Sequence, residues 1–145
     1  MNDTGLFDEE STKTLYLLDG MALFYRAHFA LIRSHRFTSG GLCTSGIFGM
    51  LNATMDLLKQ PSLTHIAVAF DTSDPTERHR IFPEYKAQRD AMPEDMSAQK
   101  PYLDRLFAAM NIPIIRTPGY EADDIIGTLA KQAVQDDFDV WMVTP

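Results

Sequence analysis

Short runs of consecutive apolar residues alternate along this chain with longer segments in which apolar residues recur every three or four positions. The short runs predict buried strands, at residues 15–18, 65–70, 112–115 and 139–144. The longer segments predict helices, at residues 21–32, 44–58, 96–110 and 121–133. Strands and helices that alternate in this way indicate the α/β fold class, with a mainly parallel sheet and helices on both faces.

The helix predicted over residues 44–58 has a polar amino end and an apolar face. Thr44 or Ser45 can cap the amino end, because a hydroxyl there accepts a hydrogen bond from a free backbone N–H. The inner face is predicted to hold large apolar residues, namely Ile47, Phe48, Leu51, Met55 and Leu58.

Two segments do not follow this alternation. Residues 1–13 are acidic and lack apolar periodicity, which predicts a disordered acidic leader. Residues 72–96 have little continuous apolar character, and about 25 residues is too long for an ordinary connection between elements. We interpret this stretch as a functional or mobile insertion after the second strand. The rest of the chain, residues 14–145, fits one domain or part of one.

The composition limits the classes of protein to which the chain can belong. Its 145 residues are 45% hydrophobic and 23% charged, as in soluble globular domains. No apolar run approaches the length of a membrane helix, and the acidic amino terminus differs from a secretory signal. The single cysteine, Cys43, excludes an internal disulfide and a cluster of thiolate ligands, and it favours a cytoplasmic location. The net charge of −7 argues against a nucleic-acid partner unless the charge is unevenly distributed.

Five acidic residues stand at matching places beside three of the predicted strands. Asp19 and Asp71 end the first and second strands. Glu121, Asp123 and Asp124 begin the helix that follows the third strand. The carboxyl ends of parallel strands meet at one edge of a sheet, where ligands bind in folds of this class. We therefore expect the five carboxylates to converge on one rim.

Carboxylates this close together repel one another unless a cation lies among them. Oxygen ligands suit Mg²⁺ or Mn²⁺, and a pair of such ions about 3.5–4 Å apart is the usual arrangement for phosphodiester hydrolysis. Two structural explanations compete with a metal site. Acids in the first turn of a helix complement its dipole, and an Asp after a strand is often a turn residue. The convergence of all five acids favours the metal site.

The long insertion carries the opposite charge. Between residues 78 and 89, four basic residues stand against Glu84 alone, a local net charge of +3: Arg78, Arg80, Lys86 and Arg89. Phe82 and Tyr85 lie among them. Basic residues interleaved with aromatic ones favour binding to a nucleic-acid backbone together with stacking on bases, although a solvated charged helix has the same composition. Beside an acidic metal rim, the segment indicates an arm that handles phosphates.

Several short motifs occur in the same order as in a known nuclease family. They are LLDG at 17–20, FYRA at 24–27, VAFD at 68–71, YKAQR at 85–89, MPED at 92–95 and PGYEADDIIGTLAK at 118–131. With these motifs the chain resembles the 5′→3′ exonuclease domain of bacterial DNA polymerase I, which belongs to the flap-endonuclease and PIN-like nucleases. The resemblance covers nearly everything from Leu15 to Pro145. It implies a PIN-like α/β fold in which the insertion after the second strand is a basic helical arch.

The resemblance also implies roles for individual residues. The family's metal-site acids match Asp19, Asp71, Glu121, Asp123 and Asp124. Lys86 and Arg89 match basic arch residues that act on the scissile phosphate. Arg26 and Tyr85 match positions that contact substrate. Together with the basic residues of the insertion, the predicted DNA-binding residues are Arg26, Arg78, Arg80, Tyr85, Lys86 and Arg89.

The activity implied by the resemblance is hydrolysis of DNA near a 5′ end or flap junction, with two Mg²⁺ or Mn²⁺ ions in the intact domain. The implied partner is DNA with a 5′ flap, a nick or a gap. The implied setting is a monomer without membrane contact, associated with the nucleoid in the cytoplasm during replication and repair.

Two features depart from the family pattern. Glu77 stands where an aromatic residue is usual, and Arg80 stands where an acid is common. The family's later Asp-Lys-Asp motif, two further metal acids and a helix-hairpin-helix-like element do not occur before Pro145. We therefore expect residues 1–145 to be a fragment of a polymerase I, and to be a poor nuclease or none by themselves.

Other functions remain open from the residues alone. A PIN-type ribonuclease has a similar acidic rim but little room for an arch, and a non-catalytic DNA-binding module could use the acids for a structural ion. An aspartyl-phosphate phosphotransferase would need a second Asp two residues after Asp19, and the phosphate-binding loop of ATPases is absent from the sequence. The histidines show no metal-ligand spacing and are interpreted as structural or surface residues: His28, His35, His65 and His79.

Overall fold

The computed structural model describes residues 12–145. The leader predicted over residues 1–13 lies almost wholly outside the described residues, and the first strand already includes Lys13. Within the described chain, the sheet consists of parallel strands in the order β3-β2-β1-β4. The strands span Lys13–Asp19 (β1), His65–Ala69 (β2), Ile114–Ile115 (β3) and Phe138–Val143 (β4). The predicted α/β class with a parallel sheet is confirmed.

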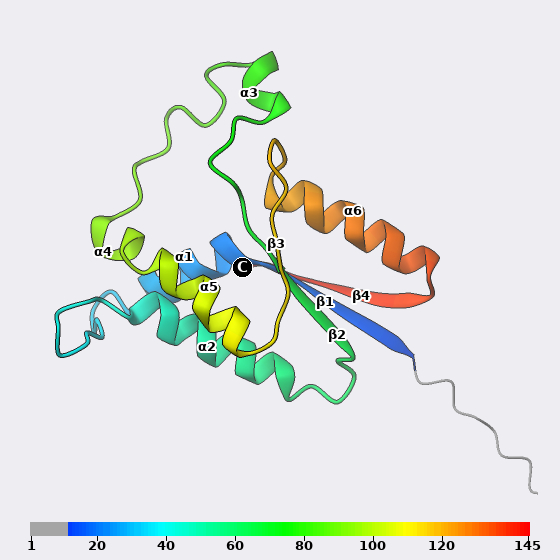
Figure 1. The fold of residues 1–145 in the computed structure, drawn as a ribbon, viewed down its shortest axis with the longest axis horizontal. Helices are drawn as coiled ribbons and strands as arrows, with labels where there is room; N and C mark the ends of the chain where they lie inside the picture. Colours follow the sequence, from blue (N-terminus) through cyan, green and yellow to red (C-terminus); the bar gives the residue numbers. More distant parts are fainter. Residues whose placement is uncertain (1–11) are drawn as a thin grey trace, which may run out of the picture.

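Helices cover both faces of this sheet, as the sequence predicts (Figure 1). One face carries α1 (Gly20–Ala30), α2 (Ser45–Leu58) and α5 (Lys100–Ala109). The other face carries α6 (Ala122–Gln135). Among the described residues, no helix has the length and apolar character needed to cross a bilayer.

Alternate side chains of the strands supply the two halves of the core. Leu18 and Val68 point to one face and pack in a cluster with Phe107 of α5. Leu17 points to the other face and packs in a cluster with Ile125 of α6. This alternation follows from the two-residue period of a strand. The packing of these two clusters holds the first turns of α1 and α6 at the carboxyl edge of the sheet.

The inner face predicted for α2 is wrong. The helix buries Ser45, Gly46, Met50 and Thr54. Three of the predicted residues are instead exposed, namely Phe48, Met55 and Leu58. The reason is that α1 and α2 approach each other closely. A Cβ atom on Gly49 would lie only 2.6 Å from Cβ of Ala27. The side of α2 that faces α1 therefore takes small residues, which hydrophobicity alone does not indicate.

The amino end of α2 is also held differently from the prediction. The Thr44 side chain makes no capping hydrogen bond, and Ser45 Oγ accepts the backbone N–H of Arg36. The buried side chain of Gln99 takes this place, since its Oε1 accepts the N–H groups of Gly46 at 2.9 Å and of the next residue at 3.2 Å. Gln99 lies where the single helix predicted over 96–110 divides into α4 (Glu94–Ser97) and α5.

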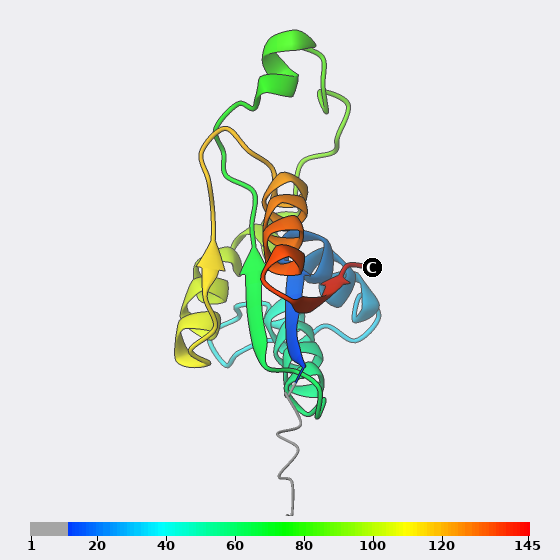
Figure 2. The same cartoon turned by 90° about the vertical axis from the view of Figure 1, so that its right-hand side faces the viewer.

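The insertion after β2, residues 72–96, stands out beyond the carboxyl ends of the strands (Figures 1 and 2). We call it the arch. It contains the short helix α3 (Glu77–Ile81) and ends in α4. The N–H of Thr76 donates to His79 Nδ1 at 3.1 Å, which closes the first turn of α3. His79 therefore has the structural role expected of it.

Candidate functional site

A cavity of about 210 Å³ lies at the carboxyl edge of the sheet. Asp19, at the end of β1, and Asp71, two residues after β2, line it from the strands. Glu121 and Asp123, at the start of α6, line it as well. The fold therefore brings together four of the five acids that the sequence assigns to a rim. We call these four residues the acid rim.

Backbone N–H groups fix the orientation of the two strand-end acids. Asp19 Oδ1 accepts the N–H of Ala22 at 3.0 Å, which makes Asp19 the cap of α1. Asp71 Oδ1 accepts the N–H of Ala122 at 2.7 Å, which ties the end of β2 to the start of α6. Both carboxylates are therefore held in place by backbone N–H groups at helix amino ends, and Asp19 caps α1 while it also lines the cavity.

The electrostatics of Asp19 show how close the acids of the rim lie. Burial raises the pKa of Asp19, and the negative charges of Asp123 and Asp71 raise it further. A carboxyl group that other carboxylates push toward its neutral form is stabilised as an anion when a cation lies beside it. The donor set of the rim consists of hard oxygen atoms, which fits Mg²⁺ or Mn²⁺ rather than a softer metal.

Asp124 is placed differently from the other predicted acids. Its two oxygens accept hydrogen bonds from the guanidinium of Arg78, each at 2.7 Å, and Oδ2 also accepts the N–H of Glu121 at 3.0 Å. The hydrogen bonds from Arg78 lower the pKa of Asp124 to about 2. Asp124 lines the groove between α3 and the start of α6, beside the cavity of the acid rim rather than inside it.

Glu121 is the residue of the rim that meets the arch most closely. Lys86 Nζ lies 2.7 Å from Glu121 Oε1, and the Tyr85 hydroxyl donates to Oε2 at 3.2 Å. Burial by itself raises the pKa of Glu121. The Lys86 ammonium and the Tyr85 hydroxyl outweigh this effect, so the pKa lies below its ordinary value.

The predicted basic residues divide into those that reach the rim and those that do not. Lys86 and Arg89 line the cavity of the acid rim, and Lys86 has a left-handed backbone with φ of 61°. Such a conformation is uncommon outside glycine, and it belongs to the turn that brings the Lys86 side chain to Glu121. Arg78 reaches the neighbouring carboxylate of Asp124, as described above.

Arg80 and Arg26 lie away from the rim. Arg80 is exposed on α3 and forms an ion pair with Glu77, three residues earlier in the same helix. The two departures from the family pattern therefore compensate one another. Arg26 is exposed and lines an apolar hollow between α1 and α2. Its neighbour Tyr25 lines the cavity of the acid rim instead, and the FYRA motif was the signal that could have indicated it.

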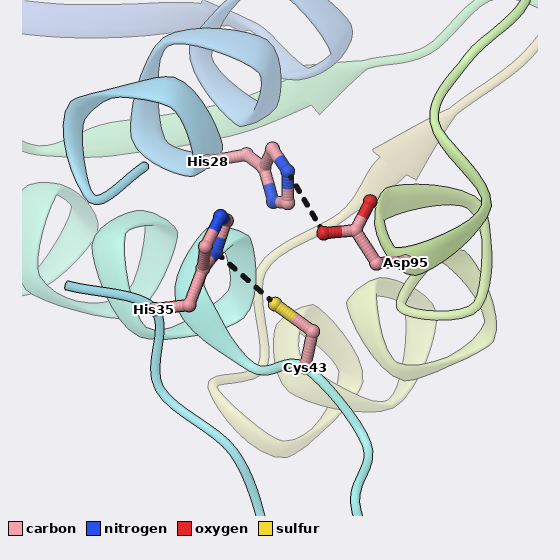
Figure 3. Close-up of side chains that lie close together, drawn as sticks. All are labelled: His28, His35, Cys43 and Asp95. Carbon is pink, nitrogen blue, oxygen red and sulfur yellow. Dashed lines mark hydrogen bonds and ion pairs between the residues drawn. The ribbon is translucent and has the colours of Figure 1, made fainter. Parts of the chain in front are cut away.

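A second group of side chains comes together near the foot of the arch. His28, His35, Cys43 and Asp95 each offer a ligand atom, and these atoms all lie within 4.8 Å of one another (Figure 3). The residues come from α1, from the loop that follows it and from α4. Sequence spacing did not indicate this group, because its members come from three segments, and Asp95 lies 52 positions after Cys43.

The sequence matches the family described as "5'-3' exonuclease, N-terminal resolvase-like domain" over residues 14–145. The chain therefore belongs to this family. Among its relatives, the DNA polymerase I of Mycobacterium bovis is 39% identical over 137 residues, which are 94% of this chain and 15% of the relative. The DNA polymerase I of Bacillus caldotenax is 41% identical over 132 residues, 91% of this chain and 15% of the relative. The 5'-3' exonuclease of Aquifex aeolicus is 38% identical over 133 residues, 92% of this chain and 45% of the relative.

Solved structures share the fold. The T5 5'-exonuclease with bound divalent zinc ions superposes with a TM-score of 0.63 at 21% identity, over 91% of this chain and 49% of that one. A T5 flap endonuclease in a pseudo-enzyme-product complex with DNA and metal ions gives a TM-score of 0.60 at 19% identity, over 91% and 48%. The chain thus spans about half the length of these structures and a smaller part of the polymerases. The PIN-like fold predicted from the sequence is confirmed.

Proposed function

We propose that this chain is part of the metal-dependent 5′→3′ exonuclease and flap-endonuclease domain of a DNA polymerase I. The observation that carries the proposal is the cavity in which the acid rim faces two arch cations, Lys86 and Arg89. Hard anionic ligands on one side and fixed positive charge on the other are the groups that a phosphodiester needs during hydrolysis. The setting would be replication and repair of chromosomal DNA in the cytoplasm, by a monomer.

The acid rim would hold Mg²⁺ or Mn²⁺, through Asp19, Asp71, Glu121 and Asp123, with Asp124 as a further ligand from the adjoining groove. When bound, a pair of such ions lowers the pKa of an attacking water and stabilises the leaving oxygen. The backbone hydrogen bonds of Asp19 and Asp71 support this role, because they hold the carboxylates before a ligand arrives. Orientation prepared in advance reduces the cost of binding.

Lys86 and Arg89 would offset the charge that builds on the phosphate during the reaction. Lys86 already pairs with Glu121, so its ammonium stands at the edge of the acid rim and would turn from the carboxylate to a phosphate bound there. Arg78 and Tyr85, which also contact the start of α6, would bind the DNA on either side of the reacting phosphate. Arg80 and Arg26 would contact DNA farther away, since both are exposed.

The groove between α3 and the start of α6 offers a path for a single strand. Its volume is about 1090 Å³, and it adjoins Asp124. Tyr120 lines the groove and is 58% exposed, which leaves its ring free to stack on a base. A strand in this groove would lead from α3 toward the acid rim, which agrees with a flap as the substrate.

The test is binding of 5′-flap DNA, measured by fluorescence anisotropy with a chelator and with Mn²⁺. Without metal the acid rim repels phosphate, so Mn²⁺ should strengthen binding by wild-type protein. Asp71→Asn should lose most of this gain, because it removes a rim carboxylate that faces the cavity. Asp139→Asn is the matched control, since Asp139 is exposed near the amino end of β4. An equal gain in Asp71→Asn and wild type would contradict the proposal.

A further inference from the structure

The group of His28, His35, Cys43 and Asp95 lies apart from the acid rim and shares no residue with it (Figure 3). His28 Nε2 lies 3.5 Å from Asp95 Oδ2, and His35 Nδ1 lies 3.6 Å from Cys43 Sγ. His28 and Cys43 are buried, whereas the Asp95 side chain is 44% exposed. The group therefore sits in the protein with one open side.

Two of the six separations among the ligand atoms match the edges of a tetrahedral zinc site, and the other four are no longer than 4.8 Å. Zinc bonds of about 2.3 Å to sulfur and about 2.0–2.1 Å to nitrogen place the two ligands about 3.6 Å apart at the tetrahedral angle. The same geometry places a nitrogen and an oxygen ligand about 3.4 Å apart. The observed pairs, at 3.6 Å and 3.5 Å, need little movement to meet these values.

The backbone prepares two of the four groups. His35 and Cys43 stand near the two feet of a loop closed by a bridge between Phe37 and Cys43 and by a hydrogen bond from Thr44 N–H to Arg36 O at 2.7 Å. This closure holds the imidazole and the sulfur side by side without a metal. A site whose ligands are already held loses less freedom when it binds.

A buried hydroxyl supports these ligands from behind. Ser45 Oγ accepts the N–H of Arg36 at 2.9 Å, so its own proton is available to the other side. On that side His35 Nδ1 lies 3.2 Å away, and the Cys43 thiol donates to Ser45 Oγ at 3.6 Å. When Cys43 is a thiolate, the Ser45 hydroxyl can donate to the sulfur instead. Hydrogen bonds of this kind orient ligands in metal sites and tune their affinity.

We propose that His28, His35, Cys43 and Asp95 form a binding site for one Zn²⁺ ion, separate from the acid rim. Two imidazoles, a thiolate and a carboxylate match a borderline-soft divalent ion in a tetrahedral site, and the two anionic ligands balance its charge. The ion fastens the loop after α1 and the end of the arch at α4 to the body of the domain. The proposal does not depend on the proposed nuclease function.

The proposal also predicts that zinc moves the proton of the His28 ring from one nitrogen to the other. Gln99 Nε2 lies 3.3 Å from His28 Nδ1, and because Gln99 Oε1 accepts two backbone N–H groups, its amide nitrogen faces the ring as a donor. The proton of metal-free, neutral His28 is therefore on Nε2, facing Asp95. Zinc at Nε2 moves that proton to Nδ1, and the hydrogen bond from Gln99 is given up.

The experiment is Co²⁺ binding by residues 1–145, followed by absorption spectroscopy. Cobalt at this site should give the intense visible bands of tetrahedral coordination and a thiolate-to-cobalt charge-transfer band in the near ultraviolet, and Zn²⁺ should abolish both. Cys43→Ser should lose the charge-transfer band, whereas Asp71→Asn on the acid rim should keep it. Absence of that band from wild type, or its loss in Asp71→Asn alone, would overturn the proposal.

Zinc affinity, measured by competition with a chromophoric chelator, provides a second readout. Asp95→Asn should weaken binding by about tenfold or more. Glu94→Gln is the matched control, because Glu94 is the exposed neighbour of Asp95 in α4. Circular dichroism of each variant without metal shows whether it folds. In wild type, zinc should change the ¹⁵N chemical shifts of His28 from those of the Nε2–H tautomer to those of the Nδ1–H tautomer. Equal zinc affinity in wild type, Cys43→Ser and Asp95→Asn would overturn the proposed site.

Discussion

The guanidinium of Arg78 in the arch makes two hydrogen bonds, each 2.7 Å long, to the carboxylate of Asp124 at the start of α6. The two residues are 46 positions apart in the sequence. A bidentate pair of this kind fixes both distance and orientation. It therefore ties α3 to the helix that carries two residues of the acid rim, and the arch is anchored above the cavity rather than free of it.

The Arg78–Asp124 pair should make the stability of the arch contact depend on pH. The pKa of Asp124 falls from an ordinary 3.8 to about 2 in the folded chain. Its contribution is therefore fully present above the ordinary pKa and is lost as the pH falls through about 2. We expect Arg78→Gln to lower the free energy of unfolding near pH 6, and the difference from wild type to shrink between about pH 4 and pH 2. Urea denaturation of both proteins at each pH measures this difference in the free energy of unfolding. A difference that stays constant over this range would contradict the role of the pair.

The arch cations should set the salt dependence of DNA binding. Each lost phosphate contact lowers the slope of log affinity against log salt by about 1. Lys86→Ala and Arg89→Ala should each show this decrease with 5′-flap DNA, because both residues line the cavity of the acid rim. Lys59→Ala is the control, since Lys59 pairs with Asp56 at the far end of α2. The same slope for all four proteins would mean that these cations do not meet the backbone.

The arch should be the first part of the described chain that trypsin cleaves. Its basic residues are mostly exposed, and α3 buries no side chain. Asp124→Asn should accelerate cleavage after Arg78 and Arg80, because it weakens the contact that holds α3. Asp139→Asn should leave the rate unchanged. Mass spectrometry of the early fragments identifies the sites, and cleavage of Asp124→Asn that is no faster than cleavage of wild type would show that the contact does not restrain the arch.

Two glycines should respond in opposite ways to replacement by alanine. A Cβ atom on Gly49 would lie 2.6 Å from Cβ of Ala27, so Gly49→Ala must separate α1 and α2. We expect a loss of about 1–3 kcal/mol in the free energy of unfolding. Gly127, within α6, has open space where its Cβ would stand, so Gly127→Ala should gain about 0.5–1 kcal/mol. Chemical denaturation compares the two, and equal effects would contradict the close helix contact.

The fold and the rim could be predicted largely from local patterns. Runs such as residues 65–70 identify buried strands, and acids at strand ends must meet wherever the strands are parallel. These two facts are enough to predict that Asp19 and Asp71 lie on the same rim. The face of α2 could not be found in this way, because the distance between two helices decides whether Gly49 or Phe48 turns inward.

Contacts between segments that lie far apart in the chain could not be predicted from the sequence. Nothing near Asp124 in the chain indicates that Arg78 binds it, and nothing near Cys43 indicates Asp95. Gln99 caps α2 from 53 residues away, in place of the local cap predicted at Thr44 or Ser45. Each of these contacts depends on where the arch and the loop after α1 come to rest, and long-range packing decides this.

The most direct test of the central claim is a titration of Mn²⁺ with the protein, followed by the electron paramagnetic resonance of the free ion. The claim is that the acids at the carboxyl edge of the sheet form a divalent metal site. We predict that wild type and Asp139→Asn remove the free-ion signal equally, whereas Asp71→Asn and Asp123→Asn remove much less, because both residues line the cavity. Cys43→Ser should behave as wild type. Equal binding by wild type and the two rim variants, or none by wild type, would contradict the account.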